Sequence, residues 1–133
     1  MFLALKGEIK GESQDKKHKG EIDVLAWSWG LSQSGNFHTG GGGGAGKANF
    51  QDISITKWVD SASAILMLYI ANGDHFSDAR LTVRKAGKKP LEYLVIEMEK
   101  VMITSISTGG SGGEDRLTEN ITLNFAKVEV KYK

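Results

Sequence analysis

Two alternating segments in the second half of the chain constrain its fold more than any other feature. In residues 94–103 and 121–132, apolar side chains recur at every second position and then change parity once. These apolar positions are Leu94, Ile96, Met98, Val101 and Ile103 in the first segment, and Ile121, Leu123, Phe125, Val128, Val130 and Tyr132 in the second. Alternation indicates β-strands with one buried face, and a one-residue change of face is typical of a β-bulge, which bends a strand. Two bent strands favour a curved sheet that closes on itself, so we expect a mainly β fold, a small closed β-barrel of two sheets or a closed sandwich.

The rest of the pattern predicts shorter strands and one α-helix. Short alternating or apolar runs indicate strands in residues 2–6, 21–31, 50–58 and 80–85. A single helical stripe is formed by Ala62, Ile65, Leu66, Tyr69 and Ile70. We expect Asp60 or Ser61 to cap the start of this helix and Asn72-Gly73 to end it. A length of 133 residues, with 40% apolar and 25% charged side chains, then predicts one mainly β domain spanning residues 1–133.

Charge and composition argue against several classes of partner and site. The chain has 17 basic and 16 acidic side chains, whereas nucleic-acid binders usually carry a basic excess. It has no cysteine, which excludes disulfides and thiolate metal sites. No stretch approaches about 18 consecutive apolar residues, and the first residues lack the basic and apolar regions of a signal peptide. We therefore expect no nucleic-acid partner, no membrane insertion and no N-terminal secretory signal.

A glycine-rich stretch matches a phosphate-binding motif only in part. Residues Gly41–Lys47 spell G-x-x-x-x-G-K, but Ala48 stands where a serine or threonine would hold magnesium. The motif also needs a buried strand before it and a helix after it, so that the helix N-terminus faces the phosphates. Neither is predicted here, because a polar segment precedes the glycines and an alternating strand follows them. We expect residues 32–49 to be a long flexible loop rather than part of a nucleotide-dependent enzyme.

The remaining candidates for catalysis or metal binding have simpler explanations. None of the three histidines, His18, His38 and His75, has a further histidine or carboxylate at metal-ligand spacing, so we expect them to be solvated loop residues. Glu97 and Glu99 share one face of a predicted strand, where a solvated surface is the usual explanation. We therefore predict no catalytic residues, no metal site, no cofactor and no enzymatic activity.

Two tryptophans flank a serine in the second predicted strand. Alternation places Trp27 and Trp29 on one face together with Leu25, and Ser28 on the other. Because indoles bury a large apolar area, we expect both to be core residues. Stacking of the indoles on sugars or bases is the alternative. It would make the protein a monomeric β-barrel that binds a small ligand or a carbohydrate.

The order of these motifs resembles the Hcp family, the tube proteins of bacterial type VI secretion. The resemblance is carried by Gly11-Glu12-Ser13, Asp15, His18, the run from Glu21 to Gly30, Gly40–Lys47, Asp60-Ser61-Ala62-Ser63, Arg84-Lys85-Ala86-Gly87, Glu92-Tyr93, Ser105 and the segment from Asp115 to Phe125. It extends over nearly the whole chain. It implies a β-barrel of two sheets with one helix, which agrees with the alternation pattern.

The resemblance also implies partners and a location. Family members form hexameric rings, and these rings stack into a tube that a contractile sheath expels together with a spike. Small secreted effectors travel in the lumen of the ring, and no cofactor or enzymatic activity belongs to the core domain. The protein is then expected in the cytoplasm before firing and outside the cell afterwards, without a cleaved signal peptide.

Two groups of contact residues follow from combining the resemblance with the residue pattern. Ser28 has the parity opposite to that of Trp27 and Trp29, and the matching strand of the family faces the lumen. We therefore expect Ser28 to face the lumen and its effectors. The extended loop of the family makes subunit or ring contacts. The residues expected to make these contacts are Phe37, Gly40, Gly41, Gly42, Gly43, Gly44, Gly46 and Lys47.

Overall fold

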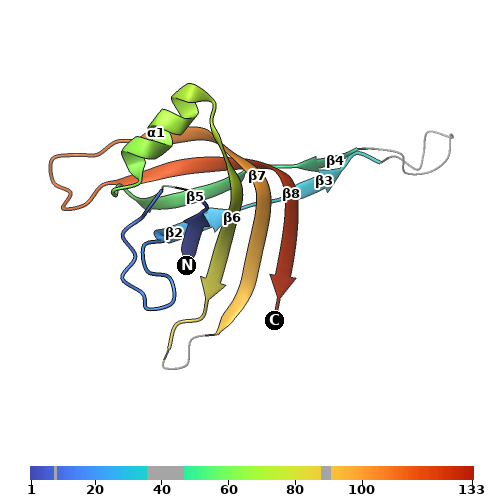
Figure 1. Cartoon of the computed structure of the whole chain (residues 1–133), viewed down its shortest axis with the longest axis horizontal. Coiled ribbons are helices and arrows are strands. Elements are labelled where there is room, and N and C mark those ends of the chain that lie inside the picture. The colour runs from blue at the N-terminus through green and yellow to red at the C-terminus, as the bar shows by residue number, and fades with distance from the viewer. Residues whose placement is uncertain (8, 36–46, 88–90) are drawn as a thin grey trace.

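The computed structural model describes residues 1–7, 9–35, 47–87 and 91–133. Within these residues, six antiparallel strands close into a barrel in the order β1-β2-β5-β8-β7-β6 (Figure 1). The barrel strands are β1 (Phe2–Leu5), β2 (Ile22–Ser28), β5 (Ile53–Trp58), β6 (His75–Arg84), β7 (Glu92–Thr108) and β8 (Thr118–Tyr132). Two short strands, β3 (Leu31–Gln33) and β4 (Ala48–Phe50), form a separate sheet, and helix α1 spans Ser63–Asn72. The predicted mainly β fold, with a closed barrel and a helix, is confirmed.

The long strands β7 and β8 both change their buried face, but they do so together. Glu99 pairs with Lys127 and Val101 with Phe125, so one residue of each strand, Lys100 and Ala126, lies between these pairs. The alignment of the two strands is therefore kept where the parity changes, and Lys100 adopts a positive φ of 53°. The prediction of a β-bulge at this change of parity is therefore wrong in its position. The register shifts farther along, between Ile103 and Ser105.

The barrel core is formed by the alternating apolar residues, and α1 covers one end of the barrel (Figure 1). Fully buried core side chains include Leu3, Ile53, Ile55, Leu81, Ile121 and Leu123. On α1, Leu66 is buried and Tyr69 stacks on Phe76 with ring centroids 4.6 Å apart. The helix ends at Gly73, whose φ of 69° is left-handed as predicted. No described helix has the length and apolar character needed to cross a membrane.

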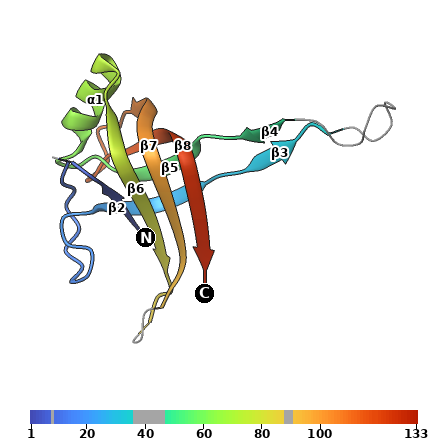
Figure 2. The same cartoon turned by 45° about the vertical axis from the view of Figure 1, so that its right-hand side comes forward.

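The segment expected to be an unstructured loop begins and ends as strands. Residues Leu31–Gln33 pair with Ala48–Phe50 and form an arm that projects away from the barrel (Figures 1 and 2). The predicted loop 32–49 is therefore wrong at both of its ends. Leu31 lies opposite Phe50, and the two side chains are 57% and 49% exposed. Residues 36–46, which include Phe37 and the candidate glycines, lie outside the described residues.

Candidate functional site

Ser28 belongs to a band of small polar side chains on the outside of the barrel. Register places Ser28 opposite Ser54, Ser54 opposite Thr122, and Thr122 opposite Ser105, so one row of hydroxyl groups crosses four strands. The alternate residues of β5 and β8 are buried, which directs this row away from the core. We call this surface the hydroxyl face and define it by Ala26, Ser28, Ser54, Thr56, Ser105, Asn120 and Thr122.

Hydrogen bonds hold several side chains of the hydroxyl face and its border in fixed positions. Thr122 Oγ1 lies 2.6 Å from Ser105 Oγ and 2.7 Å from Thr104 Oγ1. At the border of the face, Asp52 accepts hydrogen bonds from Thr104 at 2.6 Å and from the Asn124 amide at 2.9 Å. The carboxylate beside the face is thus bonded at both oxygens. The hydroxyl face itself carries neutral hydrogen-bonding groups and no charged side chain.

Trp27 in β2 and Trp29 just after it were expected to be core residues, and the structure bears this out only in part. Both are half-buried and pack against the core, and the indole N–H of Trp29 donates to the Gln51 carbonyl at 2.9 Å. Leu25 does not share their face, because a register shift between Val24 and Ala26 leaves it 40% exposed. The expectation for Leu25 is therefore wrong. A bulge inserts one unpaired residue, which alternation alone does not reveal.

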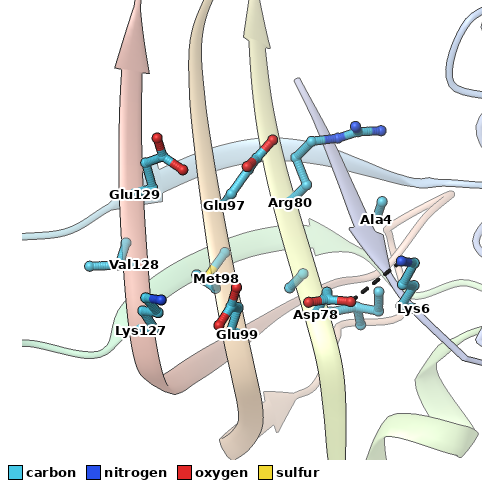
Figure 3. Close-up of a pocket in the computed structure, with 12 residues that line it drawn as sticks. Ala4, Lys6, Asp78, Arg80, Glu97, Met98, Glu99, Lys127, Val128 and Glu129 are labelled. Carbon is cyan, nitrogen blue, oxygen red and sulfur yellow. Dashed lines mark ion pairs between the residues drawn. The ribbon is translucent and has the colours of Figure 1, made fainter.

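A second surface, on the far side of the barrel, is charged and concave. A groove of about 630 Å³ crosses β1, β6, β7 and β8 (Figure 3). We call it the charged groove and define it by Lys6, Asp78, Arg80, Glu97, Glu99, Lys127 and Glu129. Ala79 and Met98, which alternate with these residues, are buried in the core. Glu97 and Glu99 are therefore on a surface face as predicted, but this face is hollowed and its charges are arranged in rows.

Each row of the charged groove contains both opposite charges and like charges in register, because Arg80 lies opposite Glu97 and Glu99 lies opposite Lys127. Register pairs Asp78 with Glu99 across β6 and β7, and Glu97 with Glu129 across β7 and β8. Lysines contact two of the four carboxylates, with Lys6 Nζ 3.5 Å from Asp78 and Lys131 Nζ 3.3 Å from Glu97. Directly opposed like charges destabilise a sheet and opposite charges stabilise it, so the two kinds of pair in these rows offset each other in part.

A buried ionic cluster, which the sequence reasoning missed, lies beneath the hydroxyl face. Lys57 on β5 is fully buried and donates to Glu119 at 2.5 Å and to Asp60 at 2.9 Å. Ser63, the first residue of α1, donates to the same Glu119 oxygen at 2.6 Å. The cluster therefore ties β5, β8 and the start of α1 together. A signal was present, because Lys57 has the parity of Ile55, and Glu119 that of Ile121.

The prediction that His18 is a solvated loop residue is wrong, because this histidine is buried and has a structural role. Its ring is buried, with Nδ1 2.9 Å from Glu21 and Nε2 2.6 Å from Glu92, and it stacks on Phe2 with ring centroids 4.4 Å apart. The hydrogen bond from His18 lowers the pKa of Glu92. His75, in contrast, is exposed at the start of β6, and His38 lies outside the described residues.

A second ion pair holds the same loop. Both terminal nitrogens of Arg84 donate to Asp15, at 2.6 and 3.0 Å. This bidentate bond lowers the pKa of Asp15 to about 2. Asp15 and His18 together fix the β1–β2 connection to the ends of β6 and β7. Both residues were part of the sequence resemblance, but only their long-range partners reveal this structural role.

Among the described ranges, the histidine and carboxylate side chains form no group of three or more suited to a metal ion. Lys47 is exposed just before β4, at the end of the arm away from the barrel, where its carbonyl accepts a hydrogen bond from the Ser34 hydroxyl at 3.4 Å. The structure therefore does not bring Lys47 and Ser28 together. Ser28 is the last residue of the barrel strand β2, whereas Lys47 directly precedes β4 of the arm.

Comparisons with known proteins agree over the length of the chain. A family model described as "Type VI secretion system effector, Hcp" matches residues 2–132. Protein hcp1 of Pseudomonas aeruginosa is 59% identical over 134 residues, which cover 100% of this chain and 82% of that protein. The crystal structure of a type VI secretion system effector from Yersinia pestis is 37% identical, with a TM-score of 0.83 over 98% of this chain and 88% of the other. The crystal structure of Hcp1 from Salmonella typhimurium is 38% identical, with a TM-score of 0.83 over 98% and 84%. The chain therefore belongs to the Hcp family, the tube proteins of the type VI secretion system.

Proposed function

We propose that this protein acts as one domain and forms hexameric rings, which stack into a tube and carry effectors in their lumen. The observation that carries the proposal is the family match over residues 2–132, together with 59% identity to Protein hcp1. A ring closed by head-to-tail contacts lets every copy use two different patches of its surface. A net charge of +1 adds little repulsion between the copies.

The hydroxyl face lines the lumen in this proposal. Ser28 and the residues in register with it are short, so they leave space in the channel, and they offer hydrogen bonds without fixed charge. The absence of charge on this face favours the release of cargo, because no ion pair has to be broken when the effector leaves. Ser28 is the central residue of effector contact.

The arm makes the contacts between copies. Its two strands end in an exposed apolar pair, Leu31 and Phe50, and a two-stranded ribbon of this kind is only marginally stable by itself. Packing against another copy covers these side chains. In this proposal the contact also involves the connection between β3 and β4, through Phe37, the glycines Gly40–Gly44 and Gly46, and Lys47. Glycines at such a contact permit close approach of two backbones.

The proposed partners beyond the tube are the contractile sheath and spike that expel it. The protein is cytoplasmic before firing and then leaves the cell with the tube, without cleavage of a signal peptide. The alternative, a monomeric barrel that binds carbohydrate through its tryptophans, loses support from the structure. Trp27 and Trp29 pack against the core and present no open stacking platform.

Native mass spectrometry tests the central step. We expect a species of six copies at micromolar protein concentration, and electron microscopy is expected to show rings with an open centre. A monomer as the main species across the concentration range would contradict the proposal. The carbohydrate alternative would gain support only if a monomer also bound a glycan with a change in tryptophan fluorescence.

A further inference from the structure

The arm joins the barrel through two connections of two residues each, which we call the root of the arm. Residues 29–30 lead from β2 into β3, and residues 51–52 lead from β4 back into β5. One backbone hydrogen bond joins the two connections, from the Gln51 N–H to the Gly30 carbonyl at 3.0 Å. Because a two-stranded ribbon is only marginally stable by itself, contacts at the root have to fix the direction in which the arm projects.

Asp52 binds the root of the arm to the two longest strands of the barrel. Its carboxylate accepts hydrogen bonds from the Thr104 hydroxyl on β7 at 2.6 Å and from the Asn124 side-chain amide on β8 at 2.9 Å. In the other connection, Trp29 packs edge-to-face on Phe125 of β8, with ring centroids 6.0 Å apart. Both connections are therefore attached to β8, at two successive residues of that strand.

The β-bulge in β7 explains why a hydroxyl group meets Asp52. The register between β7 and β8 shifts between Ile103 and Ser105, so Thr104 is the inserted residue. A bulge bends its strand and changes the direction of the side chain at this position. Because a carboxylate only accepts, Thr104 donates to Asp52, and the Thr122 hydroxyl, 2.7 Å away, must donate to Thr104. Hydrogen bonds in such a chain polarise each other, which strengthens the bond to the charged oxygen.

We propose that Asp52 is a positioning residue of ring assembly. By fixing the root to Thr104 and Asn124, it sets the direction of the arm and thereby the number of copies that close a ring. This inference rests on the proposed function, in which the arm contacts the neighbouring copy. A head-to-tail contact closes into a ring only at certain angles between neighbours and otherwise extends into an open filament. A strand rises about 3.3 Å per residue, so a small rotation at the root displaces the far end of the projecting arm (Figure 2).

A charge contact between copies is the alternative role for Asp52. Its side chain is half-buried and both carboxylate oxygens are bonded within the chain, so it is poorly placed to pair with a cation of a neighbouring copy. Asp52→Asn separates the two roles, because it removes the charge and can keep both hydrogen bonds. The amide oxygen accepts from Asn124, and the amide nitrogen donates to the Thr104 hydroxyl, which can accept as well as donate.

The direction of the arm can be measured with spin labels, because the chain has no cysteine of its own. Labels at Ser32→Cys on β3 and Ser77→Cys on β6 report the distance between arm and barrel by pulsed electron paramagnetic resonance, in samples diluted with an excess of unlabelled chain. In Asp52→Ala we expect this distance distribution to broaden about twofold, because both hydrogen bonds of the carboxylate are lost. Native mass spectrometry should show fewer six-copy species and more open or differently sized assemblies, while the circular dichroism spectrum stays native. Asp52→Asn should keep the native distribution and the six-copy species.

Two further variants control for the loss of a side chain. Asp74→Ala removes the same side chain from an exposed position after α1 and should leave both measurements unchanged. Thr104→Val should reproduce part of the broadening, and adding it to Asp52→Ala should broaden the distribution little further, because the two side chains act through one bond. A native distribution in Asp52→Ala, or an Asp52→Asn variant that behaves like Asp52→Ala, would overturn the proposal.

The spin labels also separate this inference from the proposed function. If the native protein is a monomer, the ring is contradicted, whereas broadening in Asp52→Ala still supports the role of Asp52 in directing the arm. If native rings form and the distribution does not change in Asp52→Ala, the positioning role alone is contradicted. If the distribution broadens while the six-copy species persists at its native level, the arm does not set the number of copies, and that part of the proposal is wrong.

Discussion

The hydroxyl face and the charged groove are built from the same barrel and share strands β7 and β8, yet their chemistry is opposite. On the hydroxyl face, side chains are short and neutral and several are hydrogen-bonded to one another, whereas in the groove they are charged, with both like and opposite charges in register. A neutral face binds through short-range contacts that salt does not screen, and a charged face depends on ionic strength. One barrel can therefore present two surfaces that respond to different partners and conditions.

The largest expected effect comes from the buried cluster that supports the hydroxyl face. Replacing Lys57 with Met leaves the buried Glu119 carboxylate without its cation, which should cost about 3–5 kcal/mol of unfolding free energy. We expect both surfaces to be lost together, because β5, β8 and α1 meet at this cluster. Thermal and urea unfolding followed by circular dichroism would measure the loss.

A second variant distinguishes lost charge pairing from lost packing. Lys57→Met combined with Glu119→Met removes both charges at similar volume, and we expect it to be more stable than the single variant. A double variant that is no more stable than Lys57→Met would contradict the electrostatic explanation.

Shortening the connection between β3 and β4 should affect the assembly of the rings while leaving both faces of the barrel intact. With residues 40–46 reduced to two glycines, the barrel should keep its melting temperature, because loop length alone costs little. Rings or their stacking should weaken, as measured by native mass spectrometry and electron microscopy. Normal rings and tubes from the shortened protein would show that residues 40–46 are only a linker.

Substitution of Ser28 with Gln tests the hydroxyl face alone. The longer side chain occupies lumen space but points away from the core, so the ring and the fold should be unchanged. Retention of a cognate effector, measured by co-purification with the ring, should fall. An unfolded protein, or effector retention equal to the native level, would be evidence against the lumen assignment.

The pH dependence of stability should follow the ion pair between Asp15 and Arg84. The bond to Arg84 depresses the pKa of Asp15 from 3.8 to about 2, so the folded state favours the ionised carboxylate. The stabilisation is therefore fully present above the ordinary pKa and is lost as the pH falls towards 2. The difference in melting temperature between the native chain and Asp15→Asn should shrink over that range. A constant difference at every pH would contradict this assignment.

The smallest expected effect concerns one hydroxyl group. Thr122→Val keeps the shape of the side chain but removes the oxygen that meets both Ser105 and Thr104. Because the site is solvated, the change in unfolding free energy should stay within about 0.5–1.5 kcal/mol. Thr56→Val, which loses a single bond to Asn120, provides a matched control on the neighbouring row. If Thr56→Val lowered the unfolding free energy more than Thr122→Val, the row of hydroxyl groups through Ser28 would not be more strongly hydrogen-bonded than the row through Thr56.

Much of the fold could be predicted from the local pattern of apolar residues. The predictions failed where contacts between residues far apart in the sequence determine the structure. The alternation in β7 and β8, the stripe on α1 and the outward direction of Ser28 are short-range properties, and each was predicted correctly. His18 was assigned to solvent, because its partner Glu92 lies 74 positions away in the sequence. The arm was assigned to a loop, because β3 and β4 each have three residues and depend on each other.

The sequence by itself determined which side chains face the core and which family the chain resembles. Both are carried by the order of residues along the chain, since strand parity repeats every two residues whatever the neighbouring strand is. Only the tertiary structure decided which outward side chains become neighbours. The register between strands placed hydroxyl groups beside Ser28 and carboxylates opposite each other in the groove. Register is set by long-range pairing and by bulges, and a shift of one residue would have produced two different surfaces from the same strands.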